Sequence, residues 1–241
     1  MFRLSTVLEF ENNIGRLCVS DSLDAPPYAE ILIQGGIDAA YRHPEYMLVR
    51  DIEFLHSLYS NAENMLNKVD WSSKPKWAAA ASEGSQGLGR TIVLTCFNLL
   101  ESFVGGLARA HVMCNANIDE AQATKILSAR DSLRKRIISV PRQILGREPS
   151  VDINKPPLSL LFGDIKKYRD SFVHCEPGDQ VASLGYVKEI LFHDISPRLV
   201  NDTINYTHAA IRNIWTEIHG RSGPKWLKPH KTTNLVLIPP Q

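Results

Sequence analysis

Residues 158–175 read LSLLFGDIKKYRDSFVHC, and the predicted fold and function both start from this stretch. Four apolar side chains recur in it at helical spacing: Leu161, Ile165, Tyr168 and Phe172. They form one apolar stripe, which is typical of an amphipathic helix that packs on a core by one face. Because Pro177-Gly178 follow, we expect this helix to end near Cys175.

Three polar residues late in this stretch, Arg169, Asp170 and His174, have the chemistry of a site. Asp170 and His174 are four residues apart, so they share a helix face and can hydrogen-bond. Such a bond orients the imidazole and favours its protonated form, as does the dipole at a helix C-terminus. An imidazole transfers protons near neutral pH, and a guanidinium offers a planar fork to a phosphate. The pair therefore suits RNA cleavage by attack of a ribose 2′-hydroxyl. A solvated helix face or a C-terminal cap explains the same residues.

The order Arg, polar residue, three residues of any kind, His resembles the signature of the HEPN superfamily. A second segment, residues 91–109 (TIVLTCFNLLESFVGGLAR), looks like the long second helix of those domains. Glu101 matches the acidic residue that this helix carries within its apolar run. The resemblance covers about residues 45–220.

The resemblance implies an all-helical domain, often dimeric, that cleaves RNA without a metal or other cofactor. By analogy Arg169 and His174 are catalytic and Asp170 orients them, while Glu101 positions Arg169. A homodimer brings two Arg/His sets into one cleft. The family's roles suggest a toxin or phage-defence effector, with an antitoxin or inhibitor as a further partner, or RNA processing. The chain departs from some members at Glu176, where they carry a tyrosine that a partner nucleotidyltransferase modifies.

Composition indicates an ordinary globular protein with an uneven charge distribution. The 241 residues are 44% hydrophobic and 22% charged, with a net charge of +1, enough for one large domain with an appendage. Residues 120–150 hold seven basic and three acidic side chains. This basic strip predicts RNA-phosphate contacts at Arg130 and Arg134, with Lys166 and Lys167 beside the motif. A solvated helix face is the alternative.

The four cysteines show no CxxC spacing, so we expect a reducing cytoplasm without a disulfide framework or zinc site. The N-terminus has no apolar signal-peptide core. The apolar run at 92–107 is broken by Asn98, Glu101 and two glycines, which favours a core helix over a membrane span.

The remaining pattern predicts the other elements. Helices are expected at 45–68, 88–114, 117–140 (capped by Asn117 and Glu120) and 197–219. Residues 70–87 read as a linker, whose Trp71 and Trp77 either pin it to the core, the favoured reading, or stack on bases. Strands are expected within 1–20, at 31–33 and at 234–240, and a small sheet could join the two chain ends.

The predicted fold is mainly α: a HEPN-like bundle of four to five long helices with a small β element from the chain ends. The expected domains are a β/loop appendage (1–44), the bundle (45–220) and a flexible basic tail (221–241). The predicted function is a cytoplasmic, metal-independent endoribonuclease that does not bind membranes. The alternative is a non-catalytic helical module that binds protein, nucleotide or RNA.

Overall fold

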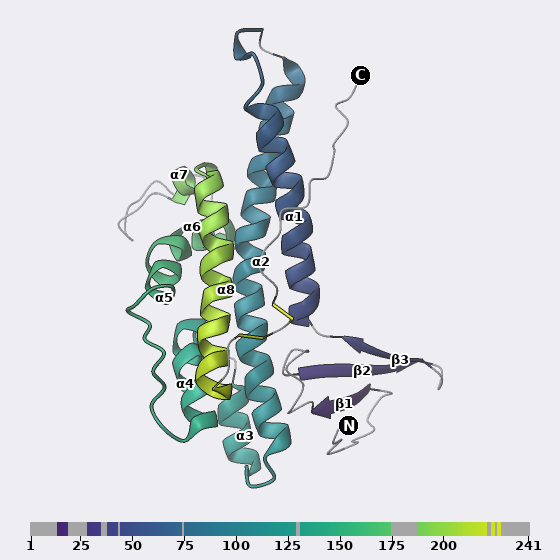
Figure 1. The fold of residues 1–241 in the computed structure, drawn as a ribbon, viewed down its shortest axis with the longest axis vertical. Helices are drawn as coiled ribbons and strands as arrows, with labels where there is room; N and C mark the ends of the chain where they lie inside the picture. The colour runs from purple at the N-terminus through teal and green to yellow at the C-terminus, as the bar shows by residue number, and fades with distance from the viewer. Residues whose placement is uncertain are drawn as a thin grey trace. The chain divides into compact units, whose positions relative to one another are not determined.

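The computed structural model describes residues 14–18, 28–34, 38–42, 44–73, 75–128, 131–174, 188–220, 223–224 and 226–227. Within these ranges the chain is mainly helical (Figure 1), which confirms the predicted class. The long helices are α1 (Pro44–Leu66), α2 (Lys76–Cys114) and α8 (Pro197–His219). The HEPN-like arrangement of the helices stays a prediction.

The chain divides into two compact units that alternate along the sequence. The first unit comprises Met1–Met47, Leu99–Ile153 and Ala209–Lys228. The second unit comprises Leu48–Asn98, Asn154–His208 and Pro229–Gln241. Helices α2 and α8 each contribute to both units. The predicted domain boundaries after residues 44 and 220 remain predictions.

The core of the second unit is built by α1, the first part of α2 and the first part of α8, which Figure 1 draws side by side. Polar contacts join the helices in two places. Ser85 of α2 donates a hydrogen bond to Glu63 of α1, and His56 Nε2 of α1 lies 2.8 Å from Asn201 Oδ1 of α8. Apolar side chains fill the rest of the interior, among them Ile52, Tyr59, Ile92, Val93, Val200 and Ile204.

Residues 158–174 form one unbroken helical run, as predicted. It consists of α5 (Leu158–Leu160), the π-helical turn η2 (Leu161–Ile165) and α6 (Lys166–His174). A π turn adds a residue to the helix and so rotates the face that follows it. Leu161 and Ile165 are buried before the rotation, and Ser171 is fully buried after it. The predicted stripe is therefore only half-buried at its far end.

The first unit contains α3 (Glu120–Leu127), α4 (Leu133–Leu145) and the last parts of α2 and α8. Its aromatic centre is Phe103 of α2, whose ring lies 6.4 Å from that of Trp215 and 6.2 Å from that of Trp226. Trp226 and Leu227 are buried, and Arg212 donates to the Leu227 carbonyl. The prediction of a flexible tail is therefore wrong at these two residues.

Three antiparallel strands precede α1, in the order β1 (Ile14–Cys18), β2 (Tyr28–Gln34) and β3 (Asp38–Arg42). In their register Ile14 lies opposite Leu32, and Glu30 lies opposite Arg42. The strands expected from residues 2–10 and 234–240 lie outside the described residues. A sheet that joins the two chain ends therefore stays a prediction.

Two predicted helix boundaries are wrong. Helix α2 begins at Lys76 rather than at residue 88, so most of the expected linker is helical. The expected third helix is divided, because α3 ends at Leu127 and α4 begins after Ser132. Ser128 and Ser132 at the break have side chains that favour helix ends over helix interiors.

The capping of these two helices also differs from the prediction. Asp119 caps α3 and forms a capping box with Gln122, in place of Asn117 with Glu120. Helix α4 continues through Pro141 to Leu145, since Ile137, Val140 and Pro141 are all buried there. Packing of this face compensates for the backbone hydrogen bond that proline removes.

The α1–α2 connection carries Trp71 on the short 3-10 helix η1 (Trp71–Ser73) and Trp77 in the first turn of α2. Their exposed fractions are 53% and 44%. The interpretation that these side chains pin a linker to the core is therefore wrong. Both indoles face solvent in the part of the chain that the structure describes.

Candidate functional site

The predicted motif lies on α6 of the second unit, after the π turn. Arg169 and Asp170 are adjacent in sequence and both are half-buried, with 34% and 20% of their side chains exposed. His174 is the last residue of α6, and its side chain lies outside the described residues. The Asp170–His174 hydrogen bond therefore stays a prediction, although the backbone puts the two residues one helical turn apart.

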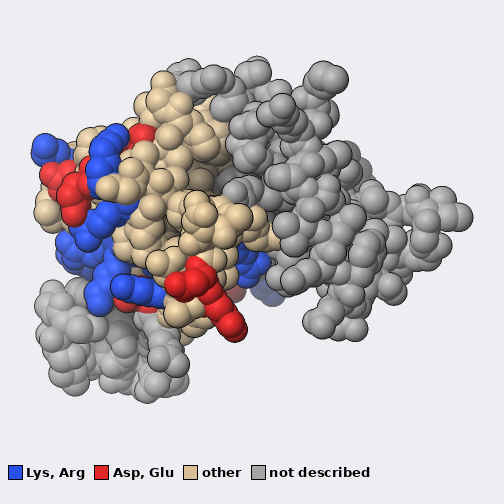
Figure 2. Space-filling view, turned by 90° about the horizontal axis from the view of Figure 1, so that it is seen from below, with Lys and Arg blue, Asp and Glu red and all other residues tan. Residues whose placement is uncertain are grey.

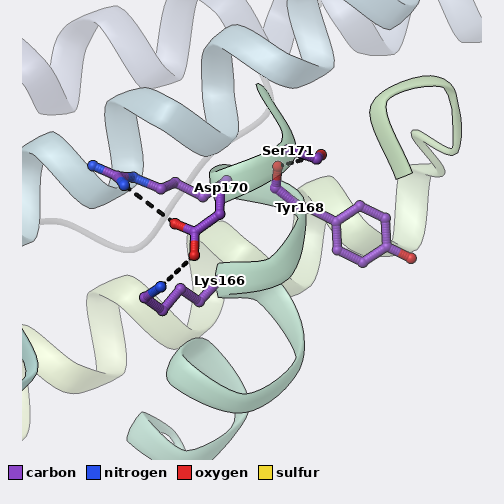
Figure 3. Close-up of polar contacts among 5 residues, drawn as sticks. Lys166, Tyr168, Asp170 and Ser171 are labelled. Atoms are coloured by element: carbon purple, nitrogen blue, oxygen red, sulfur yellow. Dashed lines mark hydrogen bonds and ion pairs between the residues drawn. The ribbon is translucent and has the colours of Figure 1, made fainter. Parts of the chain in front are cut away.

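The Asp170 carboxylate forms ion pairs with two basic side chains. Arg169 Nη1 donates to Asp170 Oδ1 at 3.2 Å, and Lys166 Nζ donates to Asp170 Oδ2 (Figure 3). Sequence reasoning missed the Lys166 pair, although the spacing of four residues favours it. Arg169 uses one of its five N–H groups in its bond to Asp170, so the guanidinium can still donate two parallel hydrogen bonds to a phosphate.

Side chains on the other face of α6 fix the helix in place. Ser171 Oγ donates to the Tyr168 carbonyl at 2.7 Å, and the Tyr168 ring points away from Asp170 (Figure 3). The Tyr168 hydroxyl donates to Asp194 Oδ2 at 3.2 Å. Burial, followed by the nearby Asp194 charge, raises the pKa of Tyr168, so the phenol remains a neutral donor.

Helix α7 (Lys188–His193) is the element against which α6 packs. The rings of Phe172 and Phe192 meet edge to face with their centroids 6.1 Å apart. Arg90 of α2 lies 4.3 Å over the Phe192 ring and donates to the Phe192 carbonyl at 3.1 Å. A cation–π contact and a hydrogen bond thus connect α2 to α7, and α7 supports the motif helix.

A second link fastens the residues after α7 to α2. Gln86 Nε2 donates to the Ile195 carbonyl at 3.1 Å, and its Oε1 accepts from the Ile195 N–H at 3.2 Å. This side chain thus satisfies both backbone groups of one buried residue outside any helix. Gln86 and Arg90 lie one turn apart on α2, and Gln86 lies within residues 70–87, which were predicted to be a linker. Their positioning role was therefore missed.

Glu101 lies on α2 within the first unit, and its carboxylate was expected to be buried. That prediction is wrong, since 54% of the side chain is exposed. Its ion-pair partner in the structure is Arg136 of α4, with 4.0 Å between Oε1 and Nη1. Its expected role in positioning Arg169 stays a prediction.

Within the described residues, four of the seven basic side chains of the predicted strip form ion pairs. Figure 2 shows Lys and Arg side chains gathered on one side of the face it draws, with acidic side chains among them. The pairs in the first unit are Lys135–Asp131, Arg136–Glu101, Arg142–Glu148 and Arg147–Glu217. Arg134 is exposed and forms no ion pair within the described ranges, whereas Arg130 lies outside them. Lys167, the predicted RNA contact beside the motif, forms an ion pair with Asp164, with 3.9 Å between Nζ and Oδ1.

Two general tests of the described residues bear on the class of protein. No three His, Cys, Asp or Glu side chains in the described ranges lie close enough to hold a metal ion. One described helix, α2 over Lys76–Met113, is long and apolar enough to cross a membrane by length and composition alone. Of its most apolar window, 67% is buried in the structure, as in a central core helix.

The chain matches no protein-family model, no curated protein and no solved structure in the comparisons made.

Proposed function

We propose that this chain is a metal-independent endoribonuclease whose active site lies at the C-terminal end of α6. The observation that carries the proposal is one continuous helix that holds Arg169, Asp170 and His174, with the arginine partly exposed and bound by a carboxylate. Arg169 binds the scissile phosphate and stabilises its developing charge. His174 transfers the proton of the attacking 2′-hydroxyl.

The proposed chemistry needs a second proton-transfer group, because one group removes the 2′-hydroxyl proton while another protonates the leaving oxygen. A homodimer with two motif helices in one cleft supplies both groups. The Asp170–Lys166 pair supports the positioning of the motif, since it fixes the carboxylate on the same helix face as His174. A defence or toxin role, with a cognate inhibitor, is part of the proposal.

The second candidate is a non-catalytic helical module that binds protein, nucleotide or RNA. The Asp170 contacts favour it, because the carboxylate that should orient His174 already holds Arg169 and Lys166. In this reading the motif is a surface ion-pair cluster that stabilises α6. Exposed ion pairs contribute about 0–1 kcal/mol, so such a cluster is a modest stabiliser.

Cleavage of RNA by purified wild type, Arg169→Ala and His174→Ala, all in EDTA, tests the proposal. We expect wild type to produce 2′,3′-cyclic-phosphate ends. Each variant should cut roughly 100- to 10,000-fold more slowly, the range typical for loss of a positioned acid–base group or a charge-stabilising donor.

Arg198→Ala is the matched control, since Arg198 is a 91% exposed cation on α8, outside the motif and within the same unit. It should cut like wild type. Equal cleavage by wild type and both motif variants would remove the catalytic assignment. Intact RNA with the wild-type protein would favour the binding module.

A further inference from the structure

The connection between α1 and α2 presents an aromatic and basic surface that the proposed active site does not use. We define the hairpin tip as Lys68, Trp71, Lys76 and Trp77. All four side chains are exposed, and the two indoles are among the largest exposed apolar groups of the described residues. Large aromatic side chains are usually more buried than this. Two exposed indoles within seven residues therefore indicate a binding surface.

Residues 70–73 of this connection form a turn with hydrogen bonds of its own. Asp70 Oδ1 accepts from the Ser72 N–H at 3.0 Å and from the Ser72 hydroxyl at 2.6 Å. The Asp70 carbonyl accepts from the Ser73 hydroxyl at 2.7 Å. These bonds place Trp71 on a rigid 3-10 turn, and Trp77 follows on the first turn of a 39-residue helix. Both indoles are therefore presented on ordered backbone, which lowers the entropy cost of binding.

The charges around the two indoles are unbalanced towards positive. Within the described part of the chain neither Lys68 nor Lys76 forms an ion pair or a side-chain hydrogen bond. The one acidic side chain of the turn, Asp70, accepts two hydrogen bonds from Ser72, which lower its pKa, so it remains one negative charge against the two lysines. The N-terminus of α2 adds partial positive charge beside Trp77.

We propose that the hairpin tip binds single-stranded RNA, with bases stacked on Trp71 and Trp77 and phosphates held by Lys68 and Lys76. Indole faces accept any base by stacking, and lysines hold the backbone as point charges. Three asparagines lie in the last turns of α1 and directly after it, at Asn61, Asn64 and Asn67, which favours a hydrated polymer over the acyl region of a bilayer. The choice of RNA rests on the proposed ribonuclease function, whereas the stacking surface does not.

Binding is best measured on the whole chain with a fluorescein-labelled, 2′-O-methylated oligouridine, which cannot be cleaved by 2′-hydroxyl attack. Fluorescence anisotropy gives the Kd of wild type, Trp71→Ala, Trp77→Ala and the double variant. We expect each single change to weaken binding roughly tenfold and the double change about a hundredfold, as for the loss of one and two stacked bases. Phe replacements should restore most of the affinity.

Phe54→Ala is the control, since Phe54 is 58% exposed on α1, within the same unit but outside the tip. It should bind like wild type, and circular dichroism checks that every variant is folded. Wild-type affinity in the double variant, equal loss in Phe54→Ala, or no binding by wild type each overturns the proposal. Vesicles of phosphatidylcholine and phosphatidylserine form a second arm, and tip-dependent vesicle binding without tip-dependent RNA binding overturns it in favour of a membrane. Tip-dependent binding by a protein that cuts no RNA leaves this proposal standing and removes only the ribonuclease.

Discussion

At the scale of single residues, the most unusual charge lies outside the motif. Glu45 lies in the first turn of α1, is 1% exposed, and has an Oε2 atom with no hydrogen-bond partner among the described residues. Burial raises the pKa of Glu45 to about 7, and this outweighs the hydrogen bond from Ser102 and the charge of Arg109, which lower it. The carboxyl is therefore protonated over part of the neutral range.

The raised pKa of Glu45 gives stability a pH dependence of known sign. The folded state holds the proton up to about pH 7, whereas the unfolded chain loses it near 4.5. The contribution of Glu45 to the free energy of unfolding is fully present below pH 4.5. It falls by about 3 kcal/mol as the pH rises to about 7. Urea unfolding from pH 4.5 to 8 should show Glu45→Gln gaining stability over wild type as the pH rises.

The control for loss of one negative charge is Glu83→Gln, an exposed position on α2. The quantity to compare is the difference in unfolding free energy between each variant and wild type, because other titrating groups cancel in it. A difference for Glu45→Gln that stays constant from pH 4.5 to 8 would contradict the buried-carboxyl interpretation.

At the residue scale, the sequence pattern predicted correctly that the motif is helical, but it did not predict the motif's side-chain contacts. The helical spacing of Leu161 and Ile165 was enough to place Arg169, Asp170 and His174 on one helix. The four-residue spacing of Lys166 and Asp170 was enough to predict their ion pair. The Tyr168–Asp194 contact, by contrast, joins residues 26 apart in sequence. No local pattern predicts a pair that only tertiary packing brings together.

At the scale of elements, α2 shows why its first turns were mistaken for a linker. Residues 82–89 contain Gly84, Gly87 and Gly89, which lower helix propensity. The chain is nevertheless helical through all three. At Gly89, just after the expected linker, it packs closely on its neighbours: a Cβ there would lie 2.4 Å from Ile195 Cγ2 and 3.3 Å from Tyr59 Cε2 and Val200 Cγ2. The glycine serves close packing, and tertiary contact overrides propensity.

This packing predicts opposite effects for two glycines of one helix. Gly89→Ala should destabilise the protein by roughly 1–3 kcal/mol, the typical cost of overpacking. Gly84→Ala is the matched control, since a Cβ there meets no atom within 4 Å. It should be neutral or stabilise by up to about 1 kcal/mol. Urea unfolding of both variants checks the pair, and equal destabilisation would argue against the close approach at position 89.

At the scale of the whole molecule, the helical spacing of apolar residues predicted the mainly helical class, and the packing of distant segments decided what that spacing could not. The burial of Trp226 next to Phe103 depends on residues 123 apart in sequence. The same holds for Arg136 and Arg147 of the basic strip, which form ion pairs with Glu101 and Glu217 from other helices. A count of charges along the chain therefore overstated the positive surface.

The proposed chemistry also predicts an assembly. Two motif helices are required for one acid and one base, so the 27.0 kDa chain should form a dimer of twice that mass. Light scattering after gel filtration measures it, in low salt and at the protein concentration used for cleavage. A strictly monomeric protein that still cuts RNA would contradict the two-helix mechanism.

The central claim is that the chain cleaves RNA by attack of a ribose 2′-hydroxyl without a metal. The most direct measurement compares wild-type cleavage of one oligonucleotide sequence in EDTA, as unmodified RNA and as its 2′-O-methylated form. We predict that the unmodified strand is cut to 2′,3′-cyclic-phosphate ends and that the methylated strand stays intact, because it lacks the nucleophile. Cleavage of both strands, or of neither, would contradict the claim.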